Sequence, residues 1–124
     1  MFPKPKKRKR SKRKALVTRL DTLVSQIVRA KTPFCVVCGK TDRLTAGHVF
    51  SRKNYSARWN FWNVHTQCLG CNLSHEYDPM PYYDWFKKEY GEEAFRELYH
   101  KWKQISKLSD IDLQELYDEL KDGN

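Results

Sequence analysis

The chain has no apolar run that approaches the roughly 18 residues needed for a membrane-spanning helix. The short apolar segment at residues 15–17 is followed by Thr18 and Arg19, which interrupt it before it could form the core of a signal peptide. Internal repeats are also missing. We therefore expect one small domain inside the cell, in the cytoplasm, or in the nucleus if the source is eukaryotic.

Acidic residues are absent from residues 1–14, which carry nine of the 24 lysines and arginines. The remaining 15 basic residues balance the 15 acidic ones, so the formal charge of +9 belongs to this basic arm. Because like charges repel, we expect a disordered arm that binds nucleic acid, followed by a single domain over 15–124. An acidic membrane surface is the lesser alternative, since no amphipathic apolar face accompanies the charge. The DNA contacts predicted in the arm are Lys6, Lys7, Arg8, Lys9 and Arg10.

Cysteine occurs only four times, as the two CxxC pairs Cys35/Cys38 and Cys68/Cys71. In a reducing cytosol, two close pairs favour metal binding over disulfides. A redox-active CxxC would be expected once, within a βαβ pattern, and neither condition is met. Four thiolates complete the tetrahedral shell of a structural zinc ion. The spacing therefore predicts one Zn²⁺ per chain, which would hold the intervening segment together.

The spacing of apolar residues predicts an α+β fold. A helical pattern covers residues 15–31 and ends before Pro33. Two strands are expected over 44–50 and 61–66, joined by a basic loop over 51–60. A short helical pattern follows at 72–76, which gives the order strand, strand, helix around the cysteines.

Residues 79–124 are expected to form a helical extension. Pro79 and Pro81 force a turn at its start, because each proline disfavours a helical residue before it. Gly91 and Ser109 provide a helix stop and a helix N-cap. The pattern predicts helices over 82–90, 92–105 and 110–121.

Five motifs lie in a fixed order between residues 35 and 99. They are CxxCG at 35–39, Ala46-Gly47-His48, Asn63-Val64-His65, Gln67-Cys68-Leu69-Gly70-Cys71-Asn72, and Tyr90-Gly91 followed by Glu92-Glu93. In this order the chain resembles the phage NinG (Rap) recombination endonucleases, a branch of the HNH, or ββα-metal, nuclease superfamily. The paired CxxC motifs and the Cys-Asn ending are more loosely similar to phage endonucleases of the recombination endonuclease VII type.

The resemblance implies a small zinc-stapled ββα core over residues 34–78, with an N-terminal helix and the C-terminal helical extension. It also implies a DNA endonuclease that depends on Mg²⁺ or Mn²⁺ and acts in recombination. The implied substrates are branched intermediates such as Holliday junctions and displacement loops (D-loops). Resolving a four-way junction takes two cuts related by symmetry, so a homodimer would fit.

Phosphodiester hydrolysis needs a base, a divalent cation and stabilisation of the leaving alkoxide. His48 is the candidate base, because an ordinary histidine pKa of about 6.5 leaves the ring largely neutral at pH 7. Asn72 is the candidate ligand for Mg²⁺ through its side-chain oxygen. By the resemblance, Asn63 would orient the loop that carries His48 through backbone hydrogen bonds.

Gly47 departs from the common HNH pattern, in which an acidic residue or a second histidine precedes the base and binds the cation. Glycine has no side chain to coordinate with, so the cation needs another ligand. His65 is the first candidate and His75 the second, one helical turn after Asn72. Glu76 is the third, with a harder oxygen ligand.

Aromatic and basic residues are interleaved around the second predicted strand. The mixture suits stacking on unpaired bases and contacts with phosphate, but the aromatic rings could equally pack the core. We expect Trp62 to be in the core and Arg52, Lys53 and Arg58 to contact phosphate.

Less specific interpretations remain for the same residues. A histidine could replace a cysteine in the zinc shell, and Asn72 could simply cap the helix after Cys71. The chain could then be a non-catalytic zinc-knuckle module that binds DNA or RNA. It could also be a nuclear regulatory protein, because residues 5–10 would serve as a nuclear localisation signal.

Overall fold

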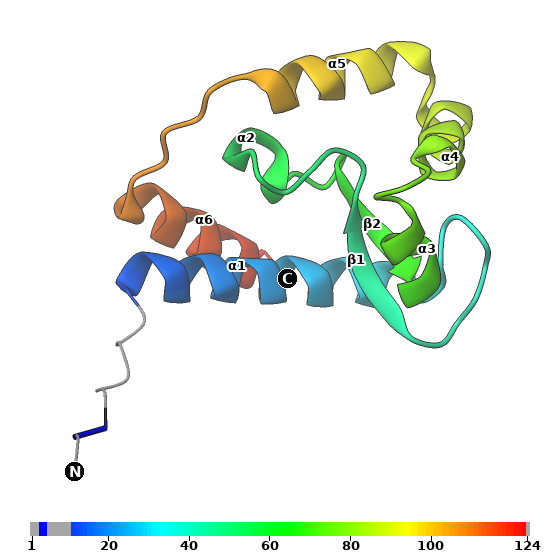
Figure 1. The fold of residues 1–124 in the computed structure, drawn as a ribbon. Helices are drawn as coiled ribbons and strands as arrows, with labels where there is room; N and C mark the ends of the chain where they lie inside the picture. The colour runs from blue at the N-terminus through cyan, green and yellow to red at the C-terminus, as the bar shows by residue number, and fades with distance from the viewer. Residues whose placement is uncertain (1–2, 5–10, 124) are drawn as a thin grey trace.

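The computed structural model describes residues 3–4 and 11–123 and has the expected α+β composition (Figure 1). Its elements are α1 (Lys12–Lys31), β1 (Leu44–His48), α2 (Tyr55–Arg58), β2 (Val64–Cys68), α3 (Leu69–Ser74), α4 (Met80–Tyr90), α5 (Glu92–Lys103) and α6 (Asp110–Asp122). The two strands form one antiparallel sheet. None of the helices within residues 11–123 combines the length and apolarity that crossing a lipid bilayer would need.

Helix α1 begins three residues before the predicted start. The Ser11 hydroxyl caps it by accepting a hydrogen bond from the Lys14 backbone N–H at 3.2 Å. Arg13 then pairs with Asp110 at 2.8 Å and donates to the Leu108 carbonyl at 2.7 Å. Residues 12–14 are therefore helical, where the sequence predicted a disordered arm. The DNA contacts predicted in the arm, Lys6, Lys7, Arg8, Lys9 and Arg10, lie outside the described residues.

The apolar face of α1 supports the rest of the domain. Leu20 and Leu113 are fully buried where α6 packs along α1, and Val64 brings β2 onto the same cluster. In Figure 1, α6 lies beside α1, and the β1–β2 hairpin crosses α1 near the C-terminal end of that helix. Thr66 strengthens this contact by donating from its hydroxyl to the Val28 carbonyl at 3.2 Å. One face of the hairpin is therefore fixed against α1.

The hairpin register pairs Gly47 with His65 and His48 with Val64. Because successive side chains in a strand point to opposite faces, His48 and Val64 face α1 and His65 faces away from it. On that other face, the Tyr82 hydroxyl of α4 donates to the Gly47 carbonyl at 2.8 Å. The register thus divides the hairpin into an α1 face and an α3/α4 face.

The predicted second strand, 61–66, is shifted to 64–68 in the structure. Residues 60–62 instead form a turn, in which the Trp62 backbone N–H donates to the Asn60 side chain at 2.8 Å. The Trp62 side chain is 54% exposed and rests edge-on against Tyr90, with ring centroids 5.1 Å apart. The expectation that Trp62 belongs to the core is therefore wrong, and the buried tryptophan is Trp59.

The predicted basic loop contains the short helix α2, which is tied to α5. Asn54 and Ser56 both donate from their side chains to the Trp102 carbonyl, at 2.9 and 2.8 Å. The Trp102 indole N–H in turn donates to the Ser51 carbonyl at 2.8 Å. These bonds join segments about 50 residues apart in sequence, which is why local patterning did not predict them.

The C-terminal helices follow the predicted order. Gly91 separates α4 from α5 with φ +96°, a backbone conformation that glycine adopts without a steric penalty. Ser109 opens α6 in a reciprocal capping box with Asp112. Phe86 and Leu98 pack with Phe50 in a second core cluster, which fastens α4 and α5 to the segment after β1.

Candidate active site and metal centre

The four cysteines converge on one point between α1 and α3. Cys35 and Cys38 lie in the loop after α1, while Cys68 ends β2 and Cys71 lies in α3. Their sulfur atoms are all within 4.8 Å of one another, and no disulfide joins them. This arrangement could hold a structural metal ion such as zinc, as the spacing predicts.

The first knuckle is shaped to present its sulfur atoms. Gly39 adopts φ +81° and returns a backbone hydrogen bond to the Cys35 carbonyl at 2.8 Å, which accounts for the glycine after CxxC. Burial raises the pKa of the Cys35 thiol, but hydrogen bonds from the backbone at Cys68 and Cys38 outweigh it and bring the pKa to about 7. Backbone N–H groups of both knuckles thus stabilise the thiolate form of Cys35, whereas burial and the neighbouring thiols raise the pKa of Cys71.

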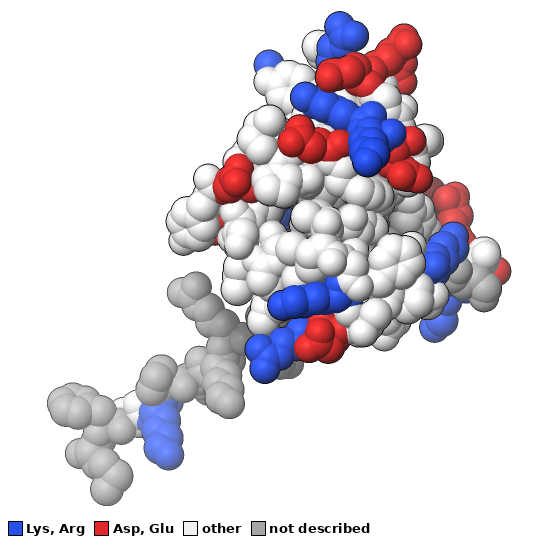
Figure 2. Space-filling model, turned by 90° about the vertical axis from the view of Figure 1, so that its right-hand side faces the viewer, with Lys and Arg blue, Asp and Glu red and all other residues white. Residues whose placement is uncertain are grey.

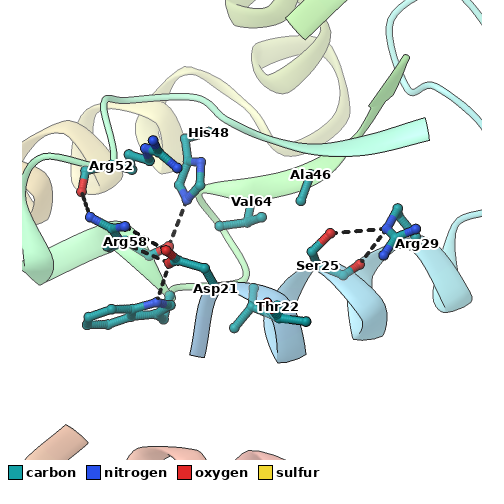
Figure 3. A pocket seen from close by; sticks show the side chains of 11 residues that line it. Asp21, Thr22, Ser25, Arg29, Ala46, His48, Arg52, Arg58 and Val64 are labelled. Carbon is teal, nitrogen blue, oxygen red and sulfur yellow. Dashed lines mark hydrogen bonds and ion pairs between the residues drawn. The ribbon is translucent and has the colours of Figure 1, made fainter. Parts of the chain in front are cut away.

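His48 lies at the end of β1 in a pocket of about 340 Å³ on the α1 face, shown in Figure 3. Its Nε2 atom lies 2.9 Å from the Arg58 carbonyl oxygen. A carbonyl only accepts, so Nε2 carries the proton and the neutral ring keeps a free lone pair on Nδ1. Burial lowers the pKa of His48 below its ordinary value, against the raising effects of the Arg58 carbonyl and Asp21. The ring is therefore held in the protonation state and tautomer of a base.

Asp21 organises the floor of this pocket and was not singled out by the sequence. It accepts two hydrogen bonds from the Arg58 guanidinium, at 2.9 and 2.6 Å, and one from the Trp59 indole at 2.8 Å. Asp21 is the first acidic residue of the chain and directly follows the buried Leu20. A lone acid beside the apolar face of a basic helix is the signal that could have identified it.

The three basic residues predicted to contact phosphate lie in different surroundings. Arg58 is engaged by Asp21, and its side chain is only 14% exposed. Arg52 and Lys53 are exposed, and Arg52 lines the His48 pocket together with Arg29. Arg58 therefore shapes the site from within, whereas Arg52 and Lys53 are accessible to a ligand.

Asn63 holds the loop between β1 and β2. Its side chain is fully buried, and its Oδ1 accepts from the Phe50 N–H at 2.8 Å. Its Nδ2 donates to the Phe50 carbonyl at 3.0 Å and to the Ala57 carbonyl at 3.1 Å. Asn63 thus positions the loop backbone next to Arg58, whose carbonyl orients His48.

Asn72 lies across β1 from the His48 ring. Its Nδ2 donates to the Thr45 hydroxyl at 3.0 Å, and that hydroxyl donates to the Gln67 carbonyl at 2.9 Å. Thr45 and Gln67 point to the α3/α4 face, whereas His48 points to the α1 face. The structure therefore does not bring the two side chains into one cavity, because the strand backbone of β1 runs between them.

The other candidate ligands also lie on the α3/α4 face. His75 ends α3, and its Nε2 lies 2.9 Å from the Val49 carbonyl oxygen. His65 Nε2 lies 2.8 Å from the Trp62 carbonyl oxygen, and its ring packs against aromatic rings, with the nearest centroid, that of Trp85, at 4.8 Å. The His75 ring also packs edge-on against Tyr82 and Tyr83, with centroids at 5.1 and 5.6 Å, but His75 lines a pocket and is therefore the better placed of the two. Glu76 is exposed.

Comparison with models of protein families matches residues 3–123 to the family described as the bacteriophage lambda NinG protein. No curated protein and no solved structure matches the chain.

The cysteine cluster predicts that purified protein carries one zinc ion per chain. Removing it with a chelator should lower the thermal midpoint by more than about 10 °C, because binding free energy to a structural site is folding free energy. Elemental analysis and thermal unfolding measure both effects. Cys38→Ser, at an exposed position, should reproduce the loss, whereas Thr41→Ala in the same loop should not. A metal-free protein of unchanged stability would contradict the assignment.

The buried bonds of Asn63 predict a large cost for Asn63→Ala. The substitution leaves the Phe50 N–H without an acceptor and the Phe50 carbonyl without its amide donor, and it removes one of the hydrogen bonds to the Ala57 carbonyl, which should cost about 2–4 kcal/mol in the free energy of unfolding. Asn60→Ala, which removes a single bond to a backbone N–H, is the control and should cost about 1 kcal/mol. Equal midpoints in urea for the two variants would refute the positioning role.

Proposed function

This chain belongs to the bacteriophage lambda NinG family, and we propose that it is a divalent-cation-dependent DNA endonuclease of the HNH, or ββα-metal, type. The observation that carries the proposal is the state of His48. Its Nε2 is committed to a backbone carbonyl, and its Nδ1 is free in a pocket that contains arginines. A neutral, oriented imidazole beside cationic groups is suited to activating water next to a phosphate.

The fold supports this proposal. Strand β1, strand β2 and helix α3 occur in the order of a ββα unit, with the short helix α2 inserted between the two strands. The four cysteines link the loop before β1 to the junction of β2 and α3, so a structural metal would clamp the unit. Asn63 fixes the loop at the opposite end of the hairpin. The cysteine cluster and Asn63 thus hold the strand that carries His48 at both ends, as a positioned base requires.

The proposed chemistry assigns a role to each group around His48. Nδ1 of His48 takes a proton from water as the water oxygen bonds to phosphorus, and the bond from phosphorus to the leaving oxygen breaks. Arg52 and Arg29, which line the pocket at opposite ends (Figure 3), attract the phosphodiester into it. Asp21 holds Arg58, whose carbonyl keeps His48 in the correct tautomer.

The donors on the α3/α4 face suit a divalent cation. Asn72 donates from Nδ2 to Thr45, which leaves its Oδ1 lone pairs for a hard ion. Mg²⁺ or Mn²⁺ bound there would supply neutralisation of the charge that develops on the phosphate and leaving oxygen.

The proposed substrate is DNA, in particular branched recombination intermediates such as Holliday junctions and D-loops. On the face shown in Figure 2, lysines and arginines alternate with acidic residues, in keeping with a charge excess that belongs to residues 1–14. Phosphate contacts by this arm would add affinity without sequence preference. Exposed Phe61 and Trp62 are available to stack on the unpaired bases of a branch point.

The second candidate function is a non-catalytic zinc-knuckle module that binds DNA or RNA. Gly47 favours it, because the position before the base has no side chain with which to bind a cation. The two functions differ in whether a cation-dependent cut occurs at all.

The proposal predicts that His48→Ala lowers cleavage by about 10²–10⁴-fold and changes DNA affinity only a few fold, because a general base contributes a factor of that size. The assay compares linear, three-way and four-way DNA with and without Mg²⁺. His100→Ala on α5 is the matched control. Cleavage by His48→Ala at the wild-type rate would reject the base. Absence of any cut by the wild type with Mg²⁺ or Mn²⁺ would favour the binding module.

A further inference from the structure

Two buried polar atoms on the α3/α4 face lack a hydrogen-bond partner, and within the described residues they are the only ones of this kind. They are Gln67 Oε1 and His75 Nδ1. Gln67 is 1% exposed. An unsatisfied buried polar atom costs about 1–3 kcal/mol. Two such atoms on one face indicate that a bound group supplies the missing partners.

Both atoms are lone-pair acceptors. His75 Nε2 lies 2.9 Å from the Val49 carbonyl and must carry the ring proton that this bond uses, so the neutral ring has an unprotonated Nδ1. The Gln67 amide oxygen is an acceptor by nature. Two acceptors cannot satisfy each other. They line the same pocket of about 280 Å³, together with Ser74, Asp78 and three thiols of the cysteine cluster, those of Cys38, Cys68 and Cys71, so the pocket adjoins the proposed zinc site.

Gln67 occupies the space that a side chain at position 47 would need. A Cβ built on Gly47 would come within 1.8 Å of Gln67 Oε1 and within 2.7 Å of its Cδ. The amide oxygen of Gln67, from β2, therefore lies where the side chain of residue 47, from β1, would begin. The Gln67 side chain thus fills the space that is left because residue 47 is glycine.

The surroundings of Gln67 connect it to the proposed cation ligand Asn72. Thr45 bridges the two residues: its hydroxyl donates to the Gln67 carbonyl and accepts from Asn72 Nδ2. The Tyr82 hydroxyl donates to the Gly47 carbonyl and so fixes the strand against which Gln67 lies. An amide oxygen, an imidazole nitrogen and the carboxylate of Asp78 are donors that Mn²⁺ and Mg²⁺ accept.

We propose that Gln67 Oε1 and His75 Nδ1 bind the divalent cation of this nuclease, with Gln67 replacing the side chain that Gly47 lacks. This inference rests on the proposed function and names the ligands of its cation. A trapped water molecule is the competing occupant, since water can donate to both atoms. Water and cation differ in how the site responds to added Mn²⁺.

The test titrates Mn²⁺ into zinc-loaded full-length protein without DNA and follows the electron paramagnetic resonance signal of free Mn²⁺. The wild type should bind one Mn²⁺. Gln67→Met keeps the length of the side chain but removes its oxygen, and it should weaken binding by at least about tenfold. Gln67→Glu should tighten binding, because it adds a negative charge. Gln104→Met, at an exposed position, is the control.

A paired substitution separates ligand loss from structural damage. Gly47→Asp alone should destabilise the protein, because its Cβ meets Gln67. Combining Gly47→Asp with Gln67→Ala removes that clash and returns an oxygen ligand, so the double variant should recover Mn²⁺ binding and thermal stability together. Zinc content, measured in every variant, shows that the cysteine cluster is intact.

Mn²⁺ binding and DNA cleavage together distinguish a failure of the ligand assignment from a failure of the endonuclease proposal. Unchanged Mn²⁺ binding by Gln67→Met, or no Mn²⁺ binding by the wild type, overturns the ligand assignment, and water then fills the pocket. If the wild type still makes His48-dependent cuts in either case, the endonuclease proposal stands. Gln67-dependent Mn²⁺ binding without cleavage would overturn the endonuclease proposal and leave the metal site.

Discussion

The register of the β1–β2 hairpin is the constraint on which the whole site depends. Pairing His48 with Val64 turns the imidazole toward α1, and pairing Gly47 with His65 leaves the opposite face to α3 and α4. A slip of one residue would exchange the two faces. The cysteine cluster at one end and the buried Asn63 at the other end prevent such a slip. A hairpin of two short strands is marginal alone, which explains why both ends are fixed.

Three histidines make the same hydrogen bond to a backbone carbonyl but lie in different surroundings. His48, His65 and His75 each have Nε2 within 2.9 Å of a backbone carbonyl, and each neutral ring therefore keeps its lone pair on Nδ1. Surroundings then separate their roles. His48 lines a pocket with arginines, His65 packs among aromatic rings, and His75 lines a pocket with Gln67 and three of the cysteines. The same hydrogen bond can thus position a proposed base, a packing group and a proposed ligand.

Local patterns predicted the features that depend on neighbouring residues. The CxxC spacing predicted the cysteine cluster, and apolar periodicity predicted α1, α4, α5 and α6 to within a few residues of their ends. Features that depend on segments distant in the sequence were not predicted. Asp21 acquires its role from Arg58, 37 residues later. Gln67 acquires its role from Gly47 across the hairpin, and Trp62 is displaced from the core by a turn that shifts β2. The separation of His48 from Asn72 followed from strand alternation once the register was known.

The most direct test of the central claim is the pH dependence of single-turnover cleavage of a four-way junction by zinc-loaded wild-type protein. In the proposed mechanism the neutral form of His48 is the active one, and burial lowers its pKa below the ordinary 6.5. The rate should therefore be level at neutral pH and fall as the pH drops through a midpoint below 6.5, with zinc still bound. A rate that ignores pH in this range, or one with its midpoint well above neutrality, would contradict a histidine base.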